Sequence, residues 1–484
     1  MTSRELLAVA VVAVPALSAL LIAAVPRRFV TPIALACALP TGGLALTLAT
    51  LALRDDPSLA HGIAIDSAGG LLLGVTALVG LASVLVSPAY LGTMRGSLPS
   101  RPRREEAYFA LLYTFWAVLL AVPLAGNLGV AWLLVEATTA VSALLVGFSG
   151  KARALEAGWK YLVLTSLGLG VALFGIVILA AGLPGGLGGL SWHTLPTYRS
   201  GSQTALVAYL LLLAGLAAKI GWAPVHNWLP DAHSEAPAPV SALLSAALLP
   251  SVLLVAWRSE HALAPVIGAH TAQTVLIGFG LVSLAVAVPF LWRSLAWKRL
   301  LAYSSLEHMG VIALGIGFAT PLAIAGVAVH IAAHAVAKAL GFYAATPLLG
   351  HEPRAAAHGV TGIGRTERRL GAAMALSLGT LAGLPPSPLF LSELLIVAGG
   401  FQAGRSWSAG IAIVLLGLAF VGLVHSLIET TAGKAHRRDS GLIPGLRSVG
   451  LLAAVSLVLL AALAGVALWL PGTHLADALV KGLS

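Results

Sequence analysis

The fold of this chain is decided by the segment Lys219–Ser245, which reads KIGWAPVHNWLPDAHSEAPAPVSALLS. It follows an apolar run of 14 residues, Ala205–Ala218, and leads into a second apolar run, Leu243–Trp257. Pro224 has no backbone N–H and clashes with the preceding turn, so a helix entering from Ala205 should end before it. An interrupted backbone at membrane depth is tolerated only where protein or water surrounds it. The lysine beside the break is therefore a candidate ion site; the alternative is a lysine that reaches the membrane surface from an ordinary helix end.

The composition places this segment in a membrane protein. The chain has 484 residues, of which 58% are hydrophobic and only 10% are charged, and its mean hydropathy is +0.95. Soluble domains have about 25% charged residues, so this composition excludes that class. The apolar runs are also too long and too continuous for the strands of a membrane β-barrel.

Cysteine content and charge exclude further classes of function. Cys37 is the single cysteine, and one thiol can neither ligate an iron–sulfur cluster nor form a disulfide, so we expect redox chemistry to belong to a partner. The net charge of +10 is dispersed among loops, which favours a role in membrane orientation over nucleic-acid binding. The apolar segment Leu6–Val25 resembles a signal peptide but is long enough to span, so we interpret it as an uncleaved first helix.

Fourteen apolar segments predict an all-α polytopic membrane protein with about 14 transmembrane helices, at 6–25, 30–53, 67–90, 107–125, 128–148, 159–182, 203–222, 239–257, 263–292, 300–319, 322–349, 369–402, 407–429 and 448–471. Loops after odd-numbered spans hold 20 of the 28 lysines and arginines, and the remaining loops and termini hold six. Positive residues concentrate on the cytoplasmic side of membrane proteins. We therefore expect the odd loops, including Arg95–Arg104 and Lys434–Arg447, in the cytoplasm and both termini outside.

A second interrupted helix predicts an internal repeat. The twelfth span contains LAGLPPSPLFLSEL, Leu381–Leu394, in which three prolines precede Glu393. It follows the first break by five spans, and an odd offset reverses orientation, as in the inverted repeats of transporters; the alternative is two coincidental proline clusters. The expected organisation is 1–106 for helices 1–3, 107–257 for the first five-helix repeat, 258–429 for the second, and 430–484 for the last loop and helix 14.

Ionisable residues within the spans are the strongest functional candidates. Glu136 lies in the middle of LGVAWLLVEATTAVSALLVGF, Leu128–Phe148, where an unpaired carboxylate costs several kcal/mol, so it needs a cation or water. The alternative is a protonated glutamate that hydrogen-bonds between helices.

A polar stripe is expected on the eleventh span. The segment VHIAAHAVAKAL sets His330, His334 and Lys338 at i, i+4 and i+8, within about 80° of one helix face. Histidine exchanges protons near neutral pH, so this stripe suits a proton relay. We rank a metal site low, because no cysteine or carboxylate at ligand spacing accompanies the histidines. A structural polar seam is the remaining alternative.

Secondary candidates lie in the tenth span and in the opening segment. Glu307 and His308 either extend the relay or stabilise the start of their helix. The four ionisable residues of the opening segment either feed protons to the relay or cap short helices; they are His226, Asp231, His233 and Glu235.

Three motifs carry a resemblance to a known family. KxGxxPxHxWLPDAH at Lys219–His233, AYSSLEHMG at Ala302–Gly310 and HxxxHAxxKAL at His330–Leu340 resemble the antiporter-like membrane subunits of respiratory complex I and its relatives. SSLEHMG, PAPVSALLS and GLPPSPLFLSE look most like the hydrogenase 4 component F branch, which includes subunits of membrane-bound hydrogenases and formate hydrogenlyase. The resemblance covers nearly the whole chain, and implies two inverted five-helix repeats and a proton path along the central membrane plane.

The resemblance also assigns roles to residues. It implies that Glu136 partners Lys219, that His330, His334 and Lys338 form the central relay, and that Glu393 is the terminal residue of the path. Ser245 stands where some relatives carry a charged residue, so water would have to bridge at that point. The expected cofactors and metals are none, and the expected partners are the lipid bilayer, other membrane subunits and a peripheral redox arm, without nucleic acid.

These observations favour a proton-translocating subunit of a complex I-like oxidoreductase, of hydrogenase 4 type, in a bacterial inner membrane. Such a subunit is not an enzyme by itself. An Mrp-like cation/proton antiporter subunit is one alternative. A non-conducting scaffold for a peripheral enzyme, including a module for CO2 hydration, is another.

Overall fold

The computed structural model describes residues 2–93, 104–293, 295–350, 361–434 and 446–469. Thirteen helices in these ranges are long and apolar enough to cross a membrane, which confirms a polytopic helical fold. They are α1 (Ser3–Ala24), α2 (Arg27–Arg54), α3 (Ser67–Thr93), α4 (Arg104–Ala121), α5 (Leu128–Val146), α6 (Ala152–Ala181), α7 (Ser202–Ile220), α9 and α10 (Ala238–Leu243 and Leu249–Ile267) joined through η5 (Leu244–Leu248), α11 (Ala269–Leu291), α12 (Trp297–Phe318), α13 (Pro321–Ala344), α18 (Ser406–Ala432) and α19 (Leu446–Trp469).

Shorter elements connect these helices. They are α8 (Leu229–Glu235), α15 (Ile363–Thr366), α16 (Arg368–Leu381), α17 (Pro388–Gln402), the hairpin of β1 (Ser58–Ala60) and β2 (Ile63–Ile65), and single turns at Val122–Leu124, Gly147–Ser149, Gly186–Gly189, Leu195–Thr197 and Pro347–Gly350. The hairpin was not predicted; its turn uses His61 and Gly62 with positive φ. Since α16 and α17 are each too short to span alone and share the predicted twelfth span, the count of 14 spans stays a prediction.

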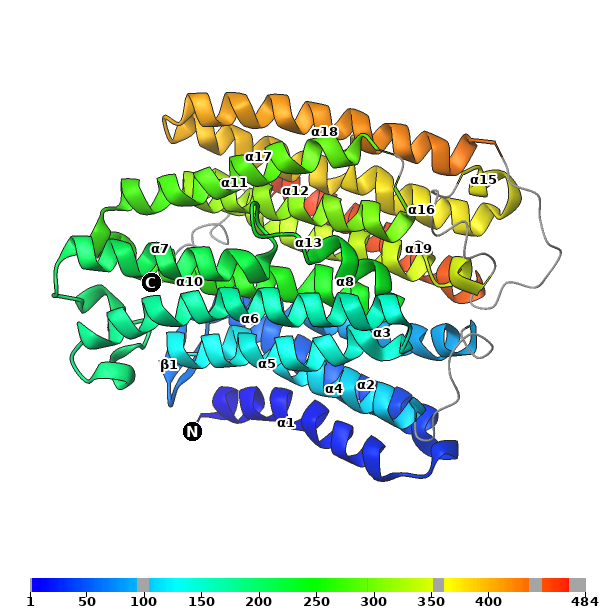
Figure 1. The fold of residues 1–484 in the computed structure, drawn as a ribbon, viewed down its shortest axis with the longest axis horizontal. Helices are drawn as coiled ribbons and strands as arrows, with labels where there is room; N and C mark the ends of the chain where they lie inside the picture. The colour runs from blue at the N-terminus through cyan, green and yellow to red at the C-terminus, as the bar shows by residue number, and fades with distance from the viewer. Residues whose placement is uncertain (1, 94–103, 294, 351–360, 435–445, 470–484) are drawn as a thin grey trace.

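Both predicted helix breaks are present. The first follows α7, which ends at Ile220 because Gly221 takes the left-handed conformation, with φ of 81°. The second lies between α16 and α17, where Gly383 has φ of 69° and Ser387 caps the new helix by accepting from Phe390 N–H. Figure 1 shows α7 and α16 approaching the middle of the molecule from opposite ends. Opposite directions are what inverted units require, although the five-helix repeat itself stays a prediction.

The connecting segments gather at two opposite ends, as the alternation of spans requires (Figure 1). At one end, contacts join the loops that follow odd-numbered spans. Arg27 lies 3.1 Å from Glu105, Arg104 lies 3.2 Å from the carbonyl of Ser149, and Thr361 lies 3.0 Å from the carbonyl of Lys434. At the other end, contacts join the N-terminus and the loops that follow even-numbered spans. Glu5 lies 3.2 Å from His61, the N–H of Gly126 lies 3.0 Å from the carbonyl of Gly62, and His270 lies 2.9 Å from Arg405. Most of the predicted cytoplasmic segments 95–104 and 434–447 lies outside the described residues.

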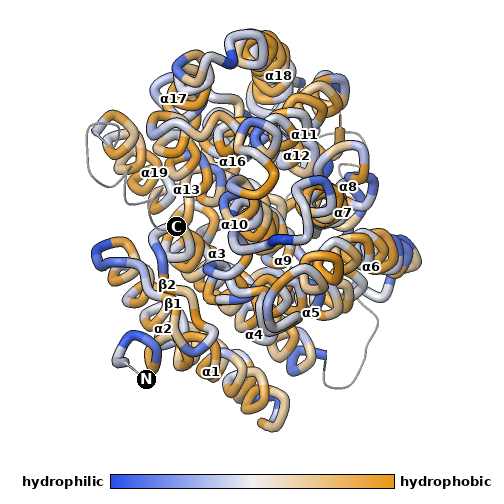
Figure 2. Tube along the Cα trace, turned by 90° about the vertical axis from the view of Figure 1, so that its left-hand side faces the viewer, coloured by the Kyte–Doolittle hydropathy of each residue, from blue (hydrophilic) through white to orange (hydrophobic). Residues whose placement is uncertain are grey.

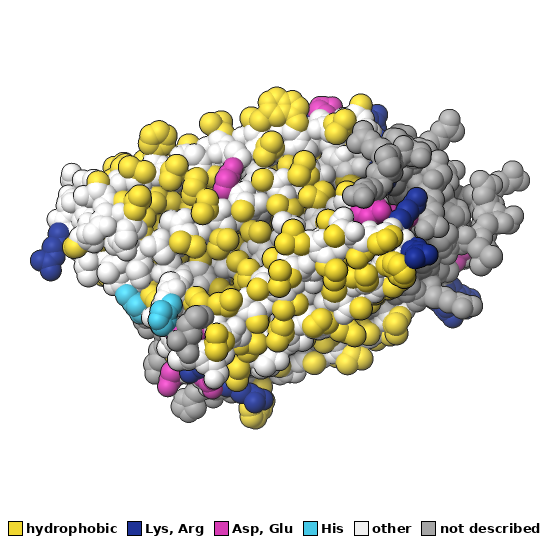
Figure 3. Space-filling model, turned by 90° about the horizontal axis from the view of Figure 1, so that it is seen from below, with side chains coloured by type: hydrophobic (Ala, Val, Ile, Leu, Met, Phe, Trp, Pro, Cys, Tyr) yellow, Lys and Arg dark blue, Asp and Glu magenta, His cyan; other side chains and the backbone are white. Residues whose placement is uncertain are grey.

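The core of the bundle contains the helices that follow the first break. Every residue is buried in the apolar stretch of Ala238–Ile267 and in that of α12. In the corresponding stretches of α18 and α19 only 22% and 17% of the residues are buried. The end-on view in Figure 2 shows α10 near the centre and α1, α6 and α18 at the periphery. Hydrophobic side chains cover the middle of the face drawn in Figure 3, and most charged side chains lie toward its ends. A polar residue in the core helices is therefore enclosed by protein.

Between α9 and α10 the backbone widens into one π-turn, η5. The N–H of Leu249 bonds to the carbonyl of Leu244, five residues earlier. Pro250 explains the widening, because in a regular helix its ring would clash with the carbonyl of Ala246. Single π-turns are frequent at functional sites. This one contains Ser245.

One predicted helix end is wrong. The eighth span is expected at 239–257, but α10 continues to Ile267. The division into repeats at 257/258 itself stays a prediction. Arg258 is 4% exposed, and its guanidinium bonds to the carboxylate of Asp66 at 2.5 Å. Glu260 is also buried. The charged residues that resembled a loop in the sequence are thus part of a helix, because Arg258 has a carboxylate partner 192 residues away.

Candidate functional site

Lys219 is fully buried in the last turn of α7. Its amine donates to the hydroxyl of Thr139 on α5 at 2.8 Å and to the hydroxyl of Tyr161 on α6. The same amine lies 4.5 Å from the centre of the Tyr161 ring, within the range of a cation–π interaction. Three helices therefore hold the lysine predicted at the first break.

The hydroxyl groups beyond Lys219 form a chain with one direction. Ser142 donates its single proton to the carbonyl of Thr138 at 2.5 Å, so it can only accept from Tyr161, whose hydroxyl lies 2.7 Å away. Tyr161 in turn accepts from Lys219. The ring of Tyr161 packs against Trp228, at 4.7 Å between ring centres. A positive charge on Lys219 is thus stabilised by oriented dipoles.

Small residues bring α6 and α7 close enough for these contacts. A Cβ at Gly215 of α7 would collide with the backbone of Gly168 and Ala172 on α6. A Cβ at Gly168 would collide with Ala218, the neighbour of Lys219. The distance between Lys219 and Tyr161 therefore depends on glycine at both positions.

Glu136 is near this lysine but does not form the expected ion pair with it. Among the described residues no carboxylate lies within 4.0 Å of the Lys219 amine. Glu136 is half-buried on α5 and accepts from the hydroxyl of Ser166 at 2.6 Å. Thr139, which bonds to Lys219, lies one turn further along the same helix. The direct partner of Lys219 on α5 is thus the Thr139 hydroxyl, and the role of Glu136 stays a prediction.

Serines connect the π-turn to the second buried lysine. Ser245 Oγ lies 2.8 Å from Ser305 Oγ on α12. The preceding residue, Ser304, accepts from the amine of Lys338, which also donates to the carbonyl of Leu301 at 2.5 Å. Lys338 is fully buried on α13. The water-bridged position expected at Ser245 therefore has a direct protein partner.

The predicted stripe on α13 continues into a histidine cluster. His330 Nε2 lies 3.1 Å from His308 Nδ1 on α12, and the ring of His334 lies 5.2 Å from that of His308. On its other side His330 Nδ1 contacts Ser392 of α17 at 2.9 Å. The nearest ligand atoms of His308, His330 and Glu393 all lie within 4.8 Å of one another. The structure brings together residues that are 85 positions apart.

The secondary candidates separate into two groups. His308 belongs to the cluster, and Glu307 precedes it, buried on the same helix. Asp231 instead forms ion pairs with Arg299 at 2.8 Å and Lys160 at 3.8 Å at the charged end of the molecule. Such partly exposed pairs serve mainly structure.

The remaining candidates lie in and beside α8. His233 is enclosed between the rings of Trp228 and Phe342, and burial, together with the charge of Lys338, lowers its pKa to about 3. His226 is 9% exposed, and burial lowers its pKa as well. Glu235 is half-buried at the end of α8. His233 is therefore neutral at physiological pH.

Sequence reasoning did not identify the hydroxyl groups that contact the candidate residues. These are Thr139, Tyr161, Ser304, Ser305 and Ser392. Ser304 and Ser305 stand in the quoted motif AYSSLEHMG, three and two residues before Glu307. A signal was therefore present as serines beside buried ionisable residues.

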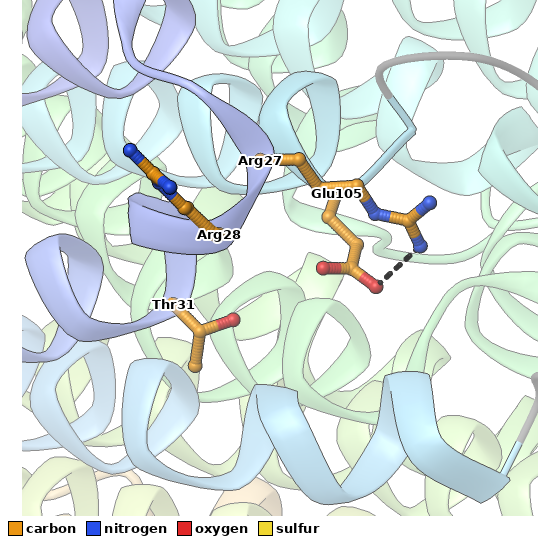
Figure 4. Close-up of a pocket in the computed structure, with 4 residues that line it drawn as sticks. All are labelled: Arg27, Arg28, Thr31 and Glu105. Atoms are coloured by element: carbon orange, nitrogen blue, oxygen red, sulfur yellow. Dashed lines mark hydrogen bonds and ion pairs between the residues drawn. The ribbon is translucent and has the colours of Figure 1, made fainter.

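A surface pocket lies apart from these residues. It has a volume of about 680 Å³ and is lined by Arg27, Arg28, Thr31 and Glu105. Figure 4 shows the ion pair between Arg27 and Glu105 within it. The candidate site is thus the buried row of polar residues and not this pocket.

A row of buried lysines, histidines and carboxylates inside a bundle of membrane-length helices defines a multi-pass membrane protein of the ion-translocating class. The model of the family described as NADH:quinone oxidoreductase/Mrp antiporter, transmembrane, matches residues 125–419. The chain belongs to this family, whose members are proton-conducting membrane subunits of complex I-like complexes or Mrp antiporters. The resemblance found in the sequence is thereby confirmed.

Individual relatives show how broad the family is. The chain is 30% identical over 392 residues to a hydrogenase-4 component F homolog of Methylacidiphilum infernorum, which covers 79% of this chain and 81% of the relative. Its fold is similar to that of a chain in an archaeal membrane-bound sulfane sulfur reductase, with a TM-score of 0.82, 19% identity and coverage of 99% and 100%. It is also similar to a chain of the Mrp complex from Dietzia sp. DQ12-45-1b, with a TM-score of 0.80, 20% identity and coverage of 100% and 97%.

Proposed function

We propose that this chain is the proton-translocating membrane subunit of a hydrogenase 4 type oxidoreductase complex in a bacterial inner membrane. The relative from Methylacidiphilum infernorum, a hydrogenase-4 component F homolog, supports this choice within the family. The redox centres of the complex belong to partner subunits. This chain supplies the membrane path and is not an enzyme by itself.

One observation carries the proposal: two lysines are fully buried without a carboxylate at ion-pair distance. Lys219 contacts the hydroxyls of Thr139 and Tyr161, and Lys338 contacts Ser304 and a backbone carbonyl. Among the described residues neither amine has an ion-pair partner. A buried amine held only by neutral dipoles gains or loses its proton when a nearby charge moves. A purely structural lysine has no need of this environment.

The contacts give an order to the proposed path. Glu136, half-buried and bonded to Ser166, loads Lys219 when it approaches the amine. The proton then passes through water to the serine pair Ser245 and Ser305 and on to Lys338. His334 and His330 lead from there to Glu393 on α17.

Orientation and partners complete the proposal. The end of the molecule that holds Arg27 and Arg104 faces the cytoplasm, and both termini lie outside. A partner subunit in the membrane and a peripheral redox arm join the chain to the complex. Both features follow from the charge distribution and from the family, whose members are subunits of larger assemblies.

The test is proton uptake per electron in vesicles that contain the assembled complex. Lys219→Ala should abolish uptake through this subunit while partner redox activity persists in part. Lys219→Arg should also fail, because arginine holds its proton at every accessible pH. Glu136→Gln should slow uptake. Lys151→Ala, at an exposed lysine, is the matched control and should behave as wild type. Wild-type stoichiometry in Lys219→Ala would refute the mechanism and support a non-conducting scaffold.

An Mrp-like cation/proton antiporter subunit is the second candidate, and the structural similarity to a chain of the Dietzia Mrp complex favours it. Both candidates use the same buried row, so variants of Lys219 do not separate them. The subunits that co-purify with the tagged chain do. Hydrogenase large and small subunits support the first candidate, and other Mrp subunits support the second.

A further inference from the structure

We propose that His308, His330 and Glu393 form a binding site for Zn²⁺ inside the membrane bundle. Their three nearest ligand atoms lie within 4.8 Å of one another, and both histidines are fully buried. The histidines come from α12 and α13, and the carboxylate comes from α17. This helix supplies the carboxylate that the sequence around His330 and His334 lacks.

The distance between the two imidazoles fits a shared metal ion. His308 Nδ1 and His330 Nε2 face each other at 3.1 Å. Two ligands of a tetrahedral zinc ion, each at about 2.0–2.1 Å, lie about 3.3 Å apart. Only a small adjustment is needed to place one ion between them. Two imidazoles and one carboxylate, with a fourth position left for water, form a ligand set that suits zinc.

A hydrogen bond already fixes His330 in the tautomer that a metal requires. Ser392 donates its single proton to the carbonyl of Leu389 at 2.7 Å, so it can only accept from His330 Nδ1–H at 2.9 Å. The neutral His330 ring therefore carries its lone pair on Nε2, which faces His308. Metal-binding histidines usually donate their other N–H to such a partner, which orients the ring.

The charge around the site also favours a divalent cation. Glu393 supplies one half-buried carboxylate, and Glu307, next to His308 in the chain, supplies a buried one. One of the Glu307 oxygens is buried without a hydrogen-bond partner among the described residues. The amine of Lys338 donates to the carbonyl of Leu301 and to the hydroxyl of Ser304. Two carboxylates balance the charge of one zinc ion.

Binding is measured on the full chain, purified through a tag without histidine and titrated with Zn²⁺. The background carries His425→Ala, because His425 and Glu429 form an exposed pair, 3.4 Å apart, that can bind zinc weakly. We expect one zinc ion per chain. His308→Ala and His330→Ala should each abolish binding, and Glu393→Gln should weaken it by about tenfold or more. His193→Asn removes an exposed histidine outside the cluster, so it should bind zinc as the background does.

X-ray absorption at the zinc edge tests the unaltered ligand set and does not depend on whether the variants fold. Two imidazoles and at least one oxygen ligand are expected. One imidazole or none, zinc retained after His308→Ala and His330→Ala together, or no zinc bound would each overturn the proposal. These measurements concern binding alone, so their outcome is independent of whether the chain conducts protons.

Discussion

The hydroxyl of Ser245 lies 2.8 Å from the hydroxyl of Ser305, and this contact joins the π-turn to α12. On the same helix, Ser304 accepts a hydrogen bond from the amine of Lys338. Ser305 donates its proton to the carbonyl of Leu301 at 2.9 Å, so the proton in the contact comes from Ser245. Two buried serines thus join the π-turn to the helix whose Ser304 bonds to Lys338. A neutral pair can support proton transfer only together with water.

Removing one hydroxyl of this pair should interrupt the path. Ser305→Ala is expected to lower the rate of proton uptake about tenfold, the effect of losing roughly 1.4 kcal/mol of stabilisation. Ser305→Thr keeps the hydroxyl and should restore most of the rate. The control is Thr41→Ala, which removes a buried hydroxyl bonded to a backbone carbonyl of α2. Equal rates in Ser305→Ala and Thr41→Ala would contradict the path.

Tyr161 is expected to position the charge of Lys219. Tyr161→Phe keeps the ring that packs on Trp228 but removes the hydroxyl that accepts from the amine. Hydrogen bonds to charged groups contribute about 1.5–3 kcal/mol, so uptake should fall about tenfold to a hundredfold. The pH profile of uptake should also shift, which a merely structural role for Tyr161 would not produce. An unchanged profile in Tyr161→Phe would argue against this role.

The ion pair of Asp66 and Arg258 should make a large contribution to stability. Asp66→Asn keeps an acceptor for Gly69 N–H but leaves the Arg258 charge buried and uncompensated. We expect the free energy of unfolding in detergent to fall by about 3–5 kcal/mol. The matched control is Asp55→Asn, since the pair of Asp55 and Arg4 is exposed and contributes less than about 1 kcal/mol. Similar losses in the two variants would refute the distinction.

His233 should make stability depend on pH. Its pKa of about 3 in the folded protein lies below the ordinary value of 6.5. As the pH falls, the unfolded chain therefore takes up the proton first. The contribution of His233 to the free energy of unfolding is complete above about pH 6.5 and is lost as the pH falls toward about 3. Between about pH 8 and about pH 5 the loss should be roughly 2 kcal/mol. His233→Leu should flatten this dependence, whereas His193→Gln, at an exposed histidine, should not.

Membrane orientation is tested by cysteine labelling in a Cys37→Ser background. Ser97→Cys lies in an odd loop rich in arginine, and a membrane-impermeant reagent should label it only from the cytoplasmic side. His61→Cys, at the exposed turn of the hairpin, should be labelled only from outside. Labelling of both positions from the same side would exclude the predicted topology.

Local sequence patterns predicted the features that depend on one segment at a time. The prolines near Lys219 and Glu393 predicted the two breaks, because a proline removes a backbone donor and clashes with the preceding turn. Single prolines do not always end a helix, and α2 continues through Pro32 and Pro40. Spacing of four predicted the common face of His330, His334 and Lys338, because helix geometry fixes it. These residues were found buried, as the hydropathy of their spans required.

Features that depend on how the helices pack were not predictable in the same way. The cluster of His308, His330 and Glu393 needs the rotation and depth of three helices, and spacing along the chain carries no information on these. The predicted end of the eighth span at residue 257 is wrong for a related reason. Arg258 is charged, and only its distant partner Asp66 makes its burial in a helix possible.

The glycine contact between α6 and α7 limits how the site can move. With no room for a methyl group between Gly168 and Gly215, the backbones of the two helices lie in direct contact at this point. We therefore expect α6 and α7 to move together, which would keep Tyr161 beside Lys219. A cycle that changes the distance between Lys219 and Glu136 would then act through α5. We expect such a motion to bend the chain at the two ends of α5, at Asn127 and at Gly147–Ser149.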